Sequence, residues 1–191
     1  NLMNKPFNYQ ISAGIGDYKT KITKYSNPTK QLNNYYEGQT LGEIWGYTTG
    51  GLFKSDEEAA SYGVDQSFLN QRINASVGEP GLRAGDLKYL DIDGDNVIST
   101  GANTADNPGD RRVIGNTLPR YSYTFSMNAQ WNGFDLSAFF QGIGHQDWYP
   151  GNYSMSFWGP YCRPYASFIP ENFMSDVWSE TNPNAYFPRP R

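Results

Sequence analysis

The clearest pattern in this sequence is an alternation of apolar and polar residues in two adjacent stretches. In residues 121–131 the odd positions are apolar or aromatic and the even positions are polar, and the alternation resumes in residues 134–142 with Phe139 as its exception. A period of two residues is typical of β-strands with one apolar face. Asn132 and Gly133 separate the stretches, and this dipeptide favours a two-residue turn because both residues tolerate positive φ. The pattern predicts an antiparallel hairpin.

A third alternating stretch starts near the beginning of the chain. Its odd positions are apolar from Phe7 to Ile15, and the phase of the alternation slips after Asp17. A β-bulge near Gly16 explains such a slip, because a bulge adds one residue to a strand. The sequence therefore predicts an all-β fold with strands over residues 7–24, 120–131 and 134–143.

The length of these strands separates two classes of β protein. Strands of soluble domains have about 5–6 residues, whereas a tilted strand that crosses a membrane needs about 9–11. The two hairpin strands are of the longer kind, and aromatic rings stand at both ends of their apolar face, as in the aromatic girdles of membrane barrels. This favours an outer-membrane β-barrel. A soluble sandwich that buries the same face against a second sheet remains the alternative.

Two long segments, residues 26–119 and 144–191, show no comparable alternation and are rich in Gly, Pro, Asn and aromatic residues. Outer-membrane barrels have short periplasmic turns and long extracellular loops. The turn at Asn132 is therefore expected on the periplasmic side and the two segments on the extracellular side, as long and irregular loops. A short helix is expected at residues 55–62, where Ser55 can cap it and acidic residues fill the first turn.

Composition limits the class of protein further. The 191 residues carry a net charge of −4, with 18% charged and 16% aromatic residues, and the mean hydropathy is −0.68. The polarity therefore comes from neutral side chains. The net charge of −4 gives no basic surface for binding nucleic acid, so we expect no nucleic-acid partner. The single cysteine allows no internal disulfide, and no apolar stretch approaches the roughly 18 residues of a membrane helix. The chain begins without a signal peptide and ends without a closing element, so we expect a fragment.

Residues 91–99 repeat the first nine positions of a calcium-binding EF-hand loop. Alternate carboxylates converge on a hard cation because such a loop coils around it. Position 12 would be Ala102, so the bidentate glutamate is absent, and Asp106 and Asp110 are the candidates to replace it from further along the chain. The alternative is a metal-free turn whose carboxylates cap backbone amides. The expected ligands are Asp91, Asp93, Asp95, the carbonyl of Val97, and Ser99.

Large aromatic side chains gather in the two long segments. They can stack on sugar rings, order the loops by packing on one another, or contact a partner protein. No nucleophile motif, phosphate-binding loop or pair of catalytic carboxylates occurs, so we expect no enzyme. The candidate contact residues are Trp45, Tyr47, Trp148, Tyr149, Trp158 and Tyr161.

Several short segments also occur in a characteristic order along nearly the whole chain. They are GQTLG at 38–42, WGY at 45–47, GLF at 51–53, GDLKY at 85–89, DIDGDNVI at 91–98, RVIGNTLPRY at 112–121, NPNA at 182–185 and FPR at 187–189. As a set they resemble the SusC/RagA-like family of TonB-dependent outer-membrane transporters, although each segment alone is weak.

The resemblance implies a barrel of about 22 strands closed by a plug, in the outer membrane of a Gram-negative bacterium. It also implies a SusD-like surface lipoprotein as a lid, and TonB as the source of energy. Its cargo would be an oligosaccharide or a peptide. From the residues alone, a secreted carbohydrate-binding β-sandwich and a calcium-dependent adhesion module remain the alternatives.

Overall fold

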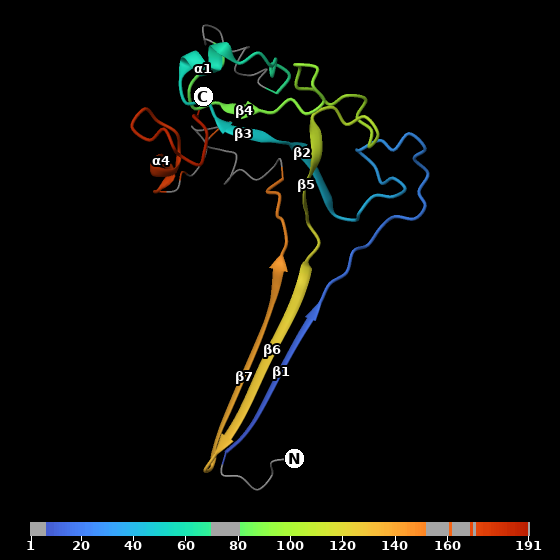
Figure 1. The fold of residues 1–191 in the computed structure, drawn as a ribbon, viewed down its shortest axis with the longest axis vertical. Coiled ribbons are helices and arrows are strands. Elements are labelled where there is room, and N and C mark those ends of the chain that lie inside the picture. The colour runs from blue at the N-terminus through green and yellow to red at the C-terminus, as the bar shows by residue number, and fades with distance from the viewer. Residues whose placement is uncertain (1–6, 70–80, 152–160, 162–168, 170, 191) are drawn as a thin grey trace. The chain divides into compact units, whose positions relative to one another are not determined.

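The computed structural model describes residues 7–69, 81–151, 161, 169 and 171–190 (Figure 1). Within these ranges, no helix is long and apolar enough to cross a membrane. The elements are β1 (Phe7–Gly16), β2 (Glu43–Tyr47), β3 (Thr49–Leu52), α1 (Asp56–Ser61), β4 (Leu87–Tyr89), β5 (Arg111–Asn116), β6 (Arg120–Trp131), β7 (Phe134–His145) and α4 (Phe173–Asp176).

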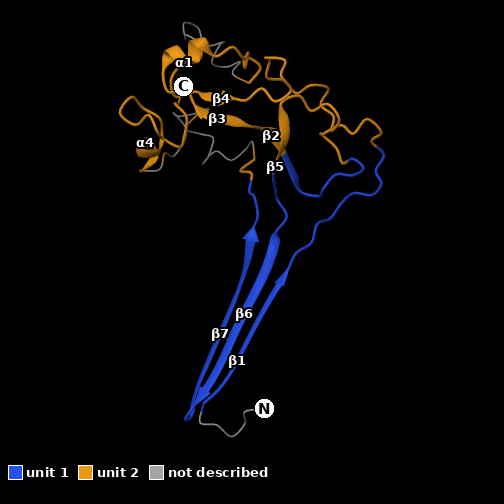
Figure 2. Cartoon of the chain, in the orientation of Figure 1, with its two compact units in different colours: residues 1–26, 36–44, 115–148 blue, residues 27–35, 45–114, 149–191 orange. Residues whose placement is uncertain are grey.

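The chain divides into two compact units, shown in different colours in Figure 2. Unit 1 comprises residues 1–26, 36–44 and 115–148, and unit 2 comprises residues 27–35, 45–114 and 149–191. Unit 1 contains β1, β6 and β7, whereas β3, β4, α1 and α4 belong to unit 2. Over the described residues the fold is therefore all-β, with two short helices.

Unit 1 is built on one three-stranded antiparallel sheet in the order β1-β6-β7, called the long sheet below. Figure 1 shows these strands running side by side. The turn between β6 and β7 consists of Asn132 and Gly133, whose φ angles are 46° and 84°. Positive φ at both positions is what this dipeptide favours. The predicted hairpin is confirmed.

β1 is shorter than expected, because it ends at Gly16 rather than near residue 24. Its last paired residue is Gly16, opposite Ser122, and β6 begins only two residues before that partner, at Arg120. Beyond Ser122, β6 therefore offers only two more residues with which β1 could pair. Asp17 instead accepts two hydrogen bonds of 2.5 Å from the guanidinium group of Arg120, so an ion pair stands where the sequence suggested a bulge.

The register of the long sheet collects the apolar side chains of three strands on one face. Ile11 lies opposite Met127, and Met127 lies opposite Ala138. On the other face the hydroxyl groups of Ser12 and Ser126 lie 2.6 Å apart. Phe7, Tyr9, Ile15, Tyr123, Phe125, Trp131, Phe134, Leu136 and Phe140 all belong to the apolar face, and each is exposed within this chain.

The segment 26–119 holds more regular structure than the irregular loop that was expected. Strand β2 pairs with β5, and β3 pairs with β4, in two-stranded sheets. These strands have only 3 to 6 residues, which is too short for a visible alternation. The helix prediction is confirmed: Ser55 caps α1 by accepting a hydrogen bond of 3.2 Å from the amide of Glu58.

Unit 2 has a core of its own. The side chains of Phe53 and Ile98 are fully buried, and Val177 is 2% exposed. Polar side chains are buried with them: Gln66 donates to the carbonyl of Leu87 at 2.8 Å. Because buried polar groups need hydrogen-bond partners, these contacts fix the loops of unit 2.

Candidate functional site

The acidic loop that begins at Asp91 is coiled, as a cation-binding loop requires. The carboxylate of Asp91 accepts hydrogen bonds from the amides of Gly94 at 2.7 Å and Asn96 at 2.8 Å. Gly94 and Asn96 have φ angles of 85° and 63°, which turn the chain around that carboxylate. Asp95 caps the amide of Val97 at 2.8 Å.

Asp110, 11 residues beyond Ser99 in the sequence, contacts the backbone of this loop. Its carboxylate is fully buried and accepts hydrogen bonds of 2.8 Å from the amides of Ile92 and Ser99. One oxygen each of Asp91, Asp93 and Asp110 lie within 4.8 Å of one another. Among the described residues this group contains two of the expected ligands and the substitute at Asp110, but not Asp95.

Asp106, the other substitute suggested by the sequence, lies elsewhere: its carboxylate forms an ion pair of 3.1 Å with Lys30. Of the remaining expected ligands, Val97 pairs with Asp65 in a parallel bridge, and the hydroxyl of Ser99 accepts from the amide of Gly101 at 3.1 Å.

The pKa values of two carboxylates in this loop are shifted in opposite directions. The amides of Asn96 and Gly94 hold the pKa of Asp91 below its ordinary value. Burial and the charges of Asp110 and Asp95 raise the pKa of Asp93. Like charges held this close repel each other, and a divalent cation would neutralise them. The donors are all oxygens, which suit a hard cation such as calcium.

The candidate aromatic residues do not form one group. Tyr47 is half-buried and packs edge-on against Tyr89 at 6.0 Å, and burial raises its pKa. Tyr161 packs edge-on against Phe173 at 5.9 Å, and burial raises its pKa to about 12. Trp148 is exposed, and so is Tyr149. Trp45 is half-buried in β2, and Trp158 lies outside the described residues.

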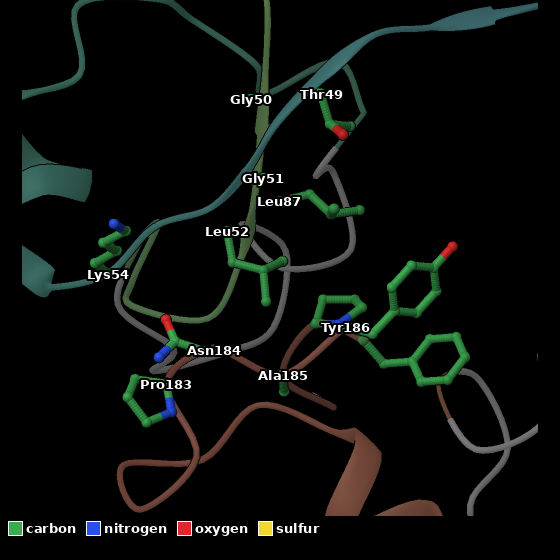
Figure 3. Close-up of a pocket in the computed structure, with 12 residues that line it drawn as sticks. Thr49, Gly50, Gly51, Leu52, Lys54, Leu87, Pro183, Asn184, Ala185 and Tyr186 are labelled. Atoms are coloured by element: carbon green, nitrogen blue, oxygen red, sulfur yellow. The ribbon is translucent and has the colours of Figure 1, made fainter.

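Unit 2 also contains a pocket that the sequence did not suggest. It has a volume of about 650 Å³ and lies between β3 and the segment 183–188. Figure 3 shows Lys54 and Asn184 toward one end, Leu52 near the middle and Tyr186 toward the other end. More than 120 residues separate the two walls in the sequence, so no local pattern could have revealed the pocket. The residues of the second wall appeared only as part of the family resemblance.

Comparisons with known proteins show sequence similarity to TonB-dependent receptors. No family model matches the chain. It is 30% identical to the TonB-dependent receptor P39 of Formosa agariphila, over an alignment of 124 positions that covers 54% of the chain. It is 24% identical to the TonB-dependent receptor P3 of the same organism, over an alignment of 207 positions that includes the whole chain.

The aligned regions make up 11% of receptor P39 and 18% of receptor P3, so the chain spans less than a fifth of the relatives it matches. The similarity, together with the all-β fold, supports the TonB-dependent receptor class that the sequence segments suggested. These relatives are receptors and not enzymes by name.

Proposed function

We propose that this chain is part of the β-barrel of a SusC-like, TonB-dependent importer in the outer membrane of a Gram-negative bacterium. The observation that carries the proposal is the apolar face of the long sheet. It continues across strands of 10 and 12 residues, long enough to cross a membrane. Large side chains on it, such as Ile11 at 56% and Phe140 at 59%, stay exposed. The similarity to two TonB-dependent receptors supports the same function.

In this proposal the apolar face contacts lipid and the opposite face lines the lumen of the barrel. The opposite face carries polar side chains that bond across strands, such as Asn128 and Ser137 at 2.8 Å. A wide barrel has a polar interior, and this face fits that requirement. The two-residue turn at Asn132 then lies at the periplasmic end, and the long segments of unit 2 lie outside the cell.

The partners follow from the same resemblance. A SusC-like importer works with a SusD-like surface lipoprotein, takes its energy from TonB and carries an oligosaccharide or a peptide. A plug and the remaining strands of the barrel would come from other parts of the protein, since the relatives are more than five times as long as the aligned region. Calcium binding by the acidic loop stays a prediction, because carboxylates that cap backbone amides explain much of the same geometry.

The experiment that tests this function uses the full-length protein in a Gram-negative host. We expect it in the outer-membrane fraction, with the heat-modifiable migration on gels that folded barrels show. Uptake of its cargo should fall to background in a matched strain that lacks TonB. Recovery as a soluble secreted protein without heat-modifiable migration would instead support a carbohydrate-binding sandwich.

A further inference from the structure

The pocket of unit 2 is preformed, because its two walls are fastened to one residue. The amide of Gly85 donates to the carbonyl of Phe53, directly after β3, at 2.8 Å. The carbonyl of Gly85 accepts from the amide of Arg189, directly after the second wall, also at 2.8 Å. The ring of Trp178 packs on Gly85 so closely that a Cβ there would lie 2.4 Å from it. The distance between the walls is therefore set by hydrogen bonds and packing.

The second wall presents two adjacent aromatic rings, Tyr186 and Phe187, on a fixed backbone. The amide of Phe187 donates to the carbonyl of Asp176 at 3.0 Å, and the carbonyl of Phe187 accepts from the amide of Trp178 at 2.9 Å. The ring of Tyr186 stands edge-on to that of Phe187, with 5.0 Å between centroids, yet Tyr186 is 86% exposed. Leaving a large ring in water forgoes the gain from burial. A rigid exposed ring is instead suited to contact a ligand at a low entropic cost.

Two solvent-exposed polar side chains, Lys54 and Asn184, also line the pocket. The side-chain amide of Asn184 and the ammonium group of Lys54 form no hydrogen bond or ion pair with a described residue. Gly50 and Gly51 also line the pocket and leave their part of its wall bare of side chains. Figure 3 shows that these polar side chains and Tyr186 lie at different ends of the pocket, so one ligand must be extended to contact both.

We infer that this pocket binds an oligosaccharide. The C–H face of a sugar ring is apolar and can stack on Tyr186, while the hydroxyl groups of a neighbouring ring can bond with Asn184 and Lys54. A volume of about 650 Å³ lies within the usual range for ligand pockets of about 300–1,000 Å³. A peptide bound as an added strand would need alternating side-chain pockets, whereas this is a single pocket with the rings of Tyr186 and Phe187 on one wall and the polar side chains of Lys54 and Asn184 toward one end. The inference rests on the proposed importer and names a binding site for its cargo.

The test measures binding of defined saccharides to the full-length protein in detergent by titration calorimetry. The probes are hexasaccharides of the malto, cello, laminari and xylo series, together with oligogalacturonate. We expect at least one probe to bind, and Tyr186→Ala to weaken its binding roughly tenfold. Tyr186→Phe keeps the ring and should keep most of the affinity, and Asn184→Ala should cost about threefold. Met174→Ala is the matched control, since Met174 is 74% exposed in α4 and does not line the pocket.

The outcomes separate the pocket from the importer. Absence of binding by every probe, or equal affinities for Tyr186→Ala and Met174→Ala, overturns the saccharide site. Binding of a random tripeptide mixture that requires Tyr186 also overturns it, in favour of a peptide. TonB-dependent uptake is measured on the same variants. Uptake without a Tyr186-dependent saccharide leaves the importer standing, whereas Tyr186-dependent binding without TonB-dependent uptake leaves only the pocket.

Discussion

The long sheet exposes large apolar side chains, whereas unit 2 buries some of its own in a core. In the long sheet, Ile15 is 77% exposed and Phe134 is 74% exposed. In unit 2, Phe53 and Ile98 are fully buried. The long sheet has long regular strands and a two-residue turn, whereas unit 2 has short strands joined by many tight turns.

This difference indicates that the two regions suit different surroundings, water for unit 2 and lipid for the apolar face of the long sheet. Unit 2 covers its apolar side chains with its own chain, and buried Gln66 donates to Leu87 and accepts from the amide of Tyr89 at 3.1 Å. The hydroxyl groups of Tyr47 and Tyr161 and the indole nitrogen of Trp178 are buried without a hydrogen-bond partner among the described residues. Because its core is buried within the chain, unit 2 suits water. The apolar face of the long sheet finds no cover within the described residues and gains most where lipid replaces water.

The largest expected effect sharpens this comparison with the same substitution in both regions. Phe53→Ala removes a fully buried ring and should lower the free energy of unfolding of unit 2 by about 3–5 kcal/mol. Phe140→Ala removes a ring that is 59% exposed and should cost much less. Native-state hydrogen exchange of the full-length protein measures both. Equal losses would contradict the division into two kinds of region.

The next substitutions test the two faces of the long sheet. Met127→Arg places a charge on the proposed lipid face and should cost about 2–4 kcal/mol near mid-membrane. Asn128→Arg places it on the polar face of the same strand and should be tolerated much better. Heat-modifiable migration and yield in the outer membrane report both variants. Damage at Asn128 equal to or greater than that at Met127 would refute the lipid-facing assignment.

A third prediction concerns calcium in unit 2, where the compact packing brings carboxylates together. Titration of the full-length protein with calcium chloride should show a bound ion, and Asp110→Asn should weaken its binding by about tenfold or more. Asp106→Asn is the matched control, because Asp106 pairs with Lys30 and lies outside the group. Absence of calcium binding, or greater sensitivity at Asp106, would favour the metal-free turn.

The smallest expected effect is a pH dependence local to α1. Lys88 donates a hydrogen bond of 2.6 Å to Glu58, and this contact, followed by the amide of Lys54, lowers the pKa of Glu58. The folded-state pKa is thus below the unfolded value of about 4.3. The stabilisation is present above that value and is lost as the pH falls through the folded-state pKa.

Thermal unfolding of the full-length protein at about pH 6 and about pH 3 measures this contribution. Glu58→Gln should remove part of the difference between the two conditions. Glu57→Gln, in the same turn of α1, is the control and should leave the difference unchanged. An identical pH response in the wild type and Glu58→Gln would show that the ion pair contributes nothing.

Much of the long sheet and the start of α1 could be predicted from the sequence. The alternation in β6 and β7, the turn at Asn132 and Gly133, and the cap at Ser55 are all visible in the sequence alone. Each depends on residues that are neighbours in the sequence. Strand pleating, turn conformation and helix capping each depend on a few consecutive residues, so the residue types in a short stretch of sequence indicate them.

The tertiary structure decided which distant residues meet. It brought Asp110 rather than Asp106 to Asp91 and Asp93, and it ended β1 at Gly16, where its partner strand begins. It also joined Phe53 to Arg189 through Gly85 and so formed the pocket. These contacts depend on chain closure over long separations and on how side chains pack, and neither leaves a periodic trace in the sequence.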